Sequence, residues 1–111
     1  LSSKTPEETY RRFMIANLTG DEFTIRSLVI DHEDANVLWQ GAYPAPVANA
    51  LSNEYRTMEI SRGESSTAEC VVLHSSAVPM ALTVVDVQGE WQVDAAPIIE
   101  FRKAAEKLKQ H

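Results

Sequence analysis

The sequence predicts an α+β fold: N-terminal helices packed on one face of a curved four-stranded antiparallel meander sheet, followed by a C-terminal helix. Apolar residues recur at helical spacing in the first half of the chain, alternate with polar residues from Tyr55 to Asp94, and return to helical spacing after Pro97. Helices, then strands, then a helix is the order typical of an α+β domain. A chain of 111 residues makes a single domain, 1–111.

The stretch from Val78 to Ala95 predicts two strands joined at Gln88-Gly89. A two-residue turn fixes the register of a hairpin, and here it pairs Val87 with Glu90, Asp86 with Trp91, and Val84 with Val93. Alternation then gathers the apolar side chains on one face, namely Met80, Leu82, Val84, Trp91 and Val93. A slip of one residue would expose the large ones at roughly 1.5–3 kcal/mol each, so the register is well specified.

Four helices are predicted from capping signals and apolar spacing. Thr5 and Pro6 begin the first, and Gly20 ends it. The second follows Asp21 or Thr19 as its cap and carries Phe23, Ile25, Leu28 and Val29. A short third helix opens at Pro46 with Val47, Ala50 and Leu51. The last starts at Pro97 with an apolar stripe of Ile98, Phe101, Ala105 and Leu108.

Two further strands are predicted between the third helix and the hairpin. One runs through Met58 and Ile60 to Gly63, and the next covers Thr67 to His74. Because Glu69 favours a solvent-facing position, the inward residues of the second strand are predicted to be Ala68, Cys70 and Val72. Leu82 would then lie opposite Val72, which places His74 beside Met80 on the helix-facing side.

Composition excludes several classes of function. With 10 basic and 16 acidic residues the net charge is −6 and the pI is near 4.9, which argues against a sequence-independent nucleic-acid binder or an anionic-membrane binder. The single cysteine, Cys70, excludes an intrachain disulfide and a cysteine zinc site. No apolar run approaches the ~20 residues of a membrane span, so no direct membrane insertion is expected, and no metal or cofactor is predicted.

The chain begins at Leu1 and not at Met. If the organism removes an N-terminal leader, the protein works outside the cytoplasm. The expectation is therefore an extracytoplasmic protein, secreted or lipid-anchored in a bacterium, over a cytoplasmic one.

The opening helix, the Gly20-Asp21 break, the second helix and a sheet ending in Gly89-Glu90-Trp91-Gln92-Val93-Asp94 resemble the nuclear transport factor 2-like, or cystatin-like, superfamily. The nearest likeness is to small bacterial lumazine-binding-like domains of unknown function. The resemblance covers about residues 5–96 and leaves out the final helix. It implies a cone whose sheet curls around a pocket closed by helices. The superfamily includes isomerases, dehydratases, cyclases and non-catalytic binders, so the fold alone does not identify the function of this chain.

One enzymatic activity can be checked on this resemblance. Aligned on Gly20-Asp21, the phenol of the ketosteroid isomerases falls at Phe13 and their general-base aspartate near Val37. Neither side chain can transfer a proton. Tyr10 and Asp34 are nearby but would take these places only with a shift in register, so the resemblance does not favour that chemistry.

Three residues are candidates for acid–base catalysis: His74, His32 and Tyr10. His32 lies in the acidic run Asp31-His32-Glu33-Asp34, for which a solvated loop is the alternative. His74 ends a strand, and the interpretation favoured over a catalytic role is a side chain bonded to water or to the backbone. Tyr10 either presents its hydroxyl to a pocket or fills the core.

The favoured function is a non-catalytic accessory domain that binds a small apolar ligand or a protein partner between sheet and helices. The ligand pocket is predicted to include Tyr10, Met14, Trp39, Tyr43, His74, Met80 and Trp91. The alternative is a pocket enzyme of isomerase, dehydratase or cyclase type that uses His74 and His32 as acid and base. A homodimer is predicted through the open face of the sheet, which carries Thr83, Val85, Val87 and Gln92.

Overall fold

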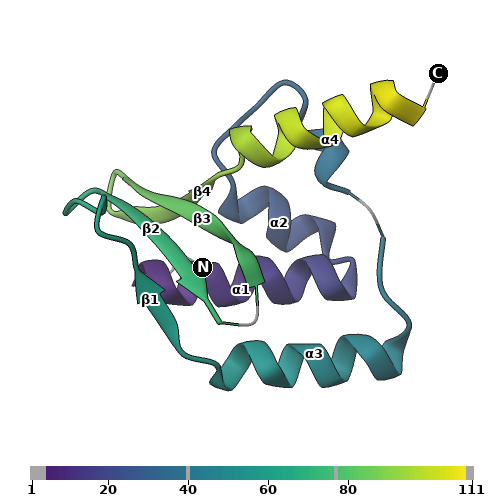
Figure 1. The fold of residues 1–111 in the computed structure, drawn as a ribbon, viewed down its shortest axis with the longest axis horizontal. Coiled ribbons are helices and arrows are strands. Elements are labelled where there is room, and N and C mark those ends of the chain that lie inside the picture. The colour runs from purple at the N-terminus through teal and green to yellow at the C-terminus, as the bar shows by residue number, and fades with distance from the viewer. Residues whose placement is uncertain (1–4, 40, 77, 110–111) are drawn as a thin grey trace.

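The computed structural model describes residues 5–39, 41–76 and 78–109, and of residues 78–80 the backbone alone. Its elements in order are α1 (Pro6–Thr19), α2 (Glu22–Leu28), the 3-10 helix η1 (Ala35–Leu38), α3 (Ala45–Thr57), β1 (Ile60–Arg62), β2 (Cys70–Ser75), β3 (Val78–Val87), β4 (Glu90–Asp94) and α4 (Ala96–Lys109). The strands form one antiparallel sheet in the order β1-β2-β3-β4, and the long helix α1 crosses behind it (Figure 1). The predicted α+β meander is confirmed.

The hairpin of β3 and β4 has the predicted register, with Val87 paired with Glu90, Asp86 with Trp91 and Val84 with Val93. Gln88 and Gly89 both take positive φ, 55° and 87°, as a tight two-residue turn requires. The Asp86 carboxylate accepts a hydrogen bond of 2.9 Å from the Gly89 amide and braces the turn. Val84 and Val93 are fully buried, and Trp91 is partly buried against the core.

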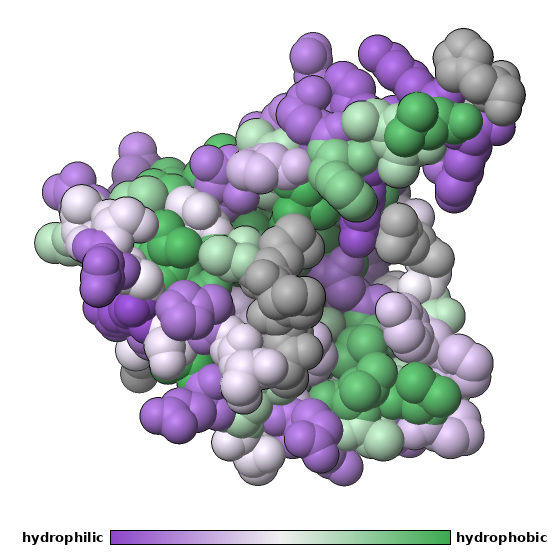
Figure 2. Space-filling model, in the orientation of Figure 1, coloured by the Kyte–Doolittle hydropathy of each residue, from purple (hydrophilic) through white to green (hydrophobic). Residues whose placement is uncertain are grey.

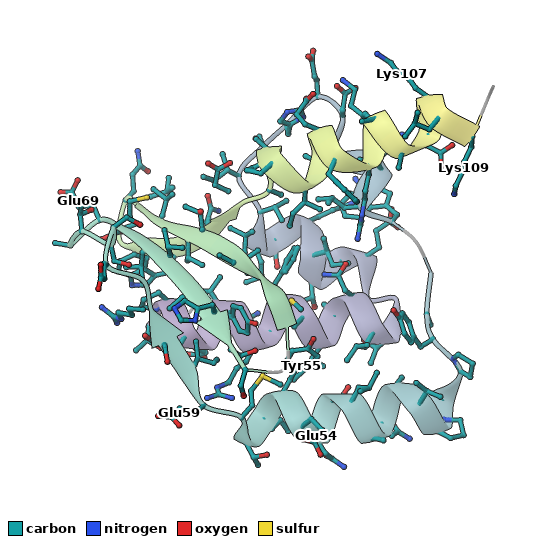
Figure 3. The ribbon with its side chains drawn as sticks, viewed as in Figure 1. Glu54, Tyr55, Glu59, Glu69, Lys107 and Lys109 are labelled. Atoms are coloured by element: carbon teal, nitrogen blue, oxygen red, sulfur yellow. The ribbon has the colours of Figure 1, made fainter. Side chains whose placement is uncertain are left out.

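The predicted orientation of β2 is wrong by one residue. Leu73, and not Val72, pairs with Leu82, and Val71 pairs with Val84. Val71 and Leu73 are fully buried, whereas Cys70 and Val72 are only partly buried and Ala68 is exposed. Glu69 misled the prediction because it lies in the bend before β2 with an exposed side chain, at the far end of the sheet (Figure 3). A charge at that place does not report which face of the strand is buried.

α1 and α2 begin and end as their caps predict. The Thr5 hydroxyl accepts from the Glu8 amide at 3.1 Å, Gly20 ends α1 in the left-handed conformation, and Asp21 accepts from the Thr24 amide to start α2. In α2, however, Phe23 is 83% exposed. Two residues along a helix turn about 200°, so Phe23 lies opposite Ile25, which faces the core.

α3 is longer than predicted and buries different residues. It begins at Ala45 and continues to Thr57, and its buried residues are Ala48 and Ser52, whereas Val47 and Leu51 are 45% and 37% exposed. Small residues on the inner side let α3 approach α1. From α1, the Arg11 guanidinium donates to the backbone oxygens of Tyr55 and of Met58, the latter at 2.8 Å. A cation there satisfies carbonyls that the helix end leaves unpaired.

α4 follows the predicted stripe only in its first turn. Ile98 and Ile99 are buried, but Phe101 and Leu108 are 74% and 76% exposed. The cause is geometric, since the helix runs past the edge of the body and its C-terminal half, with Lys107 and Lys109, projects outward (Figures 1 and 3). Within the described residues, no helix combines the length and the apolar character that a bilayer crossing needs.

The edge strand β1 is tied to the start of α1 by an ion pair. The Arg62 guanidinium donates to both carboxylate oxygens of Glu7, at 2.7 and 3.0 Å. This pairing holds the pKa of Glu7 below its ordinary value. A lowered folded-state pKa means that the pair stabilises the fold above the unfolded-state pKa, and that this contribution disappears as the pH falls through the folded-state value.

Glu7→Gln should therefore lower the thermal midpoint slightly at pH 7, because the pair is partly exposed and screened. The difference from the wild type should shrink as the pH falls below about 4, the ordinary range of a glutamate carboxyl. Melting curves recorded from pH 3 to 8 measure it. A difference that stays constant over this range would contradict the ion pair.

Candidate functional site

A cavity of about 460 Å³ lies between α1, α3, α4, the N-terminal half of β3 and the loop before α3. In the space-filling view the surface recedes between α4 and α3, and hydrophobic side chains gather over α3 (Figure 2). The described residues that line the cavity are Tyr10, Phe13, Met14, Asn17, Leu18, Gly41, Ala42, Tyr43, Pro44, Tyr55, Ala81, Leu82, Ile98 and Arg102. Its volume is in the range of small-molecule sites.

The helix α1 supplies one wall. Phe13, Met14 and Asn17 lie three, four and seven residues after Tyr10, which places all four on one side of the helix. The Asn17 side-chain amide donates back to the Phe13 carbonyl at 2.8 Å, so one of its N–H donors already has a partner. The remainder of this wall is apolar or aromatic.

The loop of residues 41–44 forms a second wall, and α1 holds it in place. The Tyr43 amide donates to the Leu18 carbonyl at 2.9 Å. Gly20 lets the loop pass close by, because a Cβ there would lie 2.8 Å from the Ala42 backbone nitrogen. The loop therefore depends on the C-terminal end of α1 for its position.

Three phenols surround the cavity. Tyr10 is fully buried, and its hydroxyl lies 3.2 Å from the Ser75 hydroxyl. Tyr55 lies between α3 and α1 (Figure 3), where burial and the nearby Tyr10 and Tyr43 phenols raise its pKa above the ordinary value. Tyr55 therefore stays protonated at neutral pH and can offer a hydrogen bond, but it is a poor base.

Arg102 is the one charged side chain among the described residues that line the cavity. It extends from α4 and donates to the Val37 carbonyl at 3.2 Å, and it also borders a second hollow beside Val37 and Glu106. Burial lowers the pKa of its guanidinium, an effect that the Tyr43 phenol opposes, and an arginine remains cationic under these conditions. Within the described part of the chain, no carboxylate forms an ion pair with it.

The structure brings together three of the seven predicted pocket residues, Tyr10, Met14 and Tyr43. The Trp39 ring lies elsewhere, 5.0 Å from the Arg26 guanidinium carbon, and borders two other hollows. Trp91 packs against the core. His74 is exposed and pairs with Ser61, on the face opposite to the one predicted. The side chain of Met80 lies outside the described residues.

The acidic loop around His32 makes contacts that fix its own shape. The His32 ring nitrogen Nδ1 accepts from the Asp34 amide at 3.0 Å, and Asp34 pairs with Lys103 of α4 at 2.8 Å. The ammonium group of Lys103 lowers the pKa of Asp34. Neither residue lines the cavity, and within the described residues no three potential metal ligands converge.

The sequence interpretation missed Tyr55, Leu82 as a pocket residue, and Arg102. Tyr55 was assigned to the start of a strand, yet it follows Ala48 and Ser52 at helical spacing, which was the available signal. Arg102 lies in the final helix, beyond the part that the family resemblance covers. No local pattern distinguishes it from Lys103, its neighbour in the chain.

Comparison of the chain with models of protein families, with curated proteins and with solved structures gave no match.

Proposed function

We propose that the domain binds a small ligand, largely apolar, in the cavity between α1, α3, α4 and β3. The observation that supports this most is the combination of size and lining. A cavity of about 460 Å³ is bordered mostly by apolar and aromatic side chains, with few polar groups at fixed places, which is the usual character of a small-molecule site.

Binding is favoured over the alternative of a pocket enzyme by what the lining contains. Among its described residues there is neither a histidine nor a carboxylate. The predicted acid and base, His74 and His32, lie outside it. The raised pKa of Tyr55 leaves a hydrogen-bond donor in place of a base. Proton abstraction, dehydration and cyclisation all need a group that accepts a proton near the substrate.

We also propose that the chain belongs to the nuclear transport factor 2-like superfamily. Helices on one side of an antiparallel sheet, with a cavity between the layers, are consistent with it. A homodimer through the open sheet face is likewise proposed. Its supporting observation is that Thr83, Val85 and Gln92 are only partly buried in the single chain and that Val87 is 37% exposed.

Ligand binding can be tested with N-phenyl-1-naphthylamine, a neutral apolar dye that fluoresces on leaving water. The wild type should bind it saturably at one site. Met14→Trp places a larger ring on the α1 wall and should weaken binding at least tenfold, a loss of about 1.4 kcal/mol or more. Fluorescence titration gives both dissociation constants.

Leu51→Trp is the matched control, since Leu51 lies on α3 outside the described lining and is already 37% exposed. It adds the same ring to the protein and should leave dye affinity unchanged. Absence of saturable binding to the wild type, or equal weakening by both variants, would refute the proposed site.

A further inference from the structure

We infer that the ligand is an amphipathic carboxylate whose head group pairs with Arg102 beside Tyr43, while its apolar body extends toward α1 and β3. This inference rests on the proposed function and names the chemistry of the ligand. It is argued from the charge, the free donors and the polarity of the cavity wall.

The charge of the cavity is opposite in sign to that of the protein. The chain carries −6 overall, yet the described lining residues contain one cation, Arg102, and no carboxylate. A partly buried guanidinium without a carboxylate partner loses hydration and gains little in return. An anionic ligand would supply the missing partner, and a single cation matches a single negative charge.

The guanidinium also has donors to spare. Its five N–H groups form a planar fork, and the described contacts use one of its nitrogens, which donates to the Val37 carbonyl. That bond fixes the side chain while leaving other N–H groups for a ligand. A carboxylate matches such a fork with two parallel hydrogen bonds, and the neighbouring Tyr43 hydroxyl can donate a further one.

Elsewhere the cavity selects for an apolar body. Phe13, Met14 and Leu82 line it together with Ile98, and these side chains offer no hydrogen bonds. The polar groups that remain are phenols and an amide, which suit ligand oxygens and provide no second cation. A long polar or multiply charged molecule would leave its charges unpaired there, at considerable cost.

Decanoate and 1-decanol, both kept at monomeric concentrations, differ only in the head group and can be compared as competitors of the neutral dye. The wild type should bind decanoate at least tenfold more tightly than decanol. Arg102→Met removes the charge and keeps an apolar stem, and it should abolish this preference while changing decanol affinity less than threefold. Arg102→Lys should retain part of the preference, because the charge remains without the planar fork.

Lys103→Met is the matched control: it removes one positive charge from the next residue, whose ammonium pairs with Asp34 and does not line the cavity. It should keep the full preference for decanoate. If the wild type binds both competitors equally, or if Lys103→Met loses the preference as Arg102→Met does, the inference fails and the proposed site stands. If neither the competitors nor the dye bind, the inference about the carboxylate and the proposed site both fail. Should Arg102→Met not fold, Tyr43→Phe and Arg102→Lys together provide the second test. If both variants keep the full preference for decanoate over decanol, the inference is overturned.

Discussion

Leu73→Ala should lower the free energy of unfolding by about 2–5 kcal/mol, the usual cost of emptying a well-packed leucine site. Leu73 is fully buried and pairs with Leu82 across the two central strands. Its side chain therefore lies in the middle of the layer between the sheet and α1, where neighbouring strands limit how far the structure can collapse. Urea denaturation followed by circular dichroism measures the change.

His74→Ala is the control for Leu73→Ala, because it alters the next residue of the same strand. His74 is exposed on the opposite face, so its replacement should change stability by no more than about 0.5 kcal/mol. The two variants together decide which face of β2 is buried. A large loss from His74→Ala with a small one from Leu73→Ala would restore the inverted orientation that the sequence suggested.

Gly20→Ala should destabilise the protein by roughly 2–5 kcal/mol, because two costs add. The residue has φ of 69°, where an L side chain costs about 1–2 kcal/mol. Its Cβ would also lie 2.8 Å from the Ala42 nitrogen and 3.0 Å from the Ala42 Cβ, and relieving such overpacking typically costs about 1–3 kcal/mol. The loop that walls the cavity must then move, so dye affinity should fall as well.

Gly41→Ala separates the two costs. Gly41 has φ of 80°, but apart from its two chain neighbours no described residue has an atom within 4 Å of a Cβ placed there. It should show only the conformational cost of about 1–2 kcal/mol, with dye affinity reduced far less than in Gly20→Ala. Thermal melts and dye titration on the same samples test both expectations, and equal effects of the two substitutions would argue against close packing of the loop on α1.

The features that followed from the sequence are those set by local chemistry. Thr5, Pro6 and Gly20 define α1 through their own hydrogen bonds and dihedral angles. The turn at Gln88-Gly89 fixes a register through its length alone. Such signals do not depend on what the rest of the chain does, and the structure agrees with each of them.

The predictions that failed concern features that depend on distant parts of the chain. Whether Val71 or Val72 faces inward is set by the strand opposite and by α1, and a single charge at Glu69 could not decide it. Phe101 and Leu108 fit an amphipathic pattern, but the body ends before it reaches them. The candidate site shows the same division, since its α1 residues Tyr10 and Met14 were predicted, whereas Tyr55 and Arg102 reach it through tertiary packing.

The cavity wall combines a rigid part with parts that can open locally. Leu82 belongs to a central strand paired on both sides, whereas residues 41–44 are held to α1 by a backbone hydrogen bond and by the fit at Gly20. Segments with few buried contacts separate from a fold at much lower free energy than its central strands do. We therefore expect residues 41–44 to be the part of the cavity wall that separates from the fold at the lowest free energy, while the sheet keeps its shape.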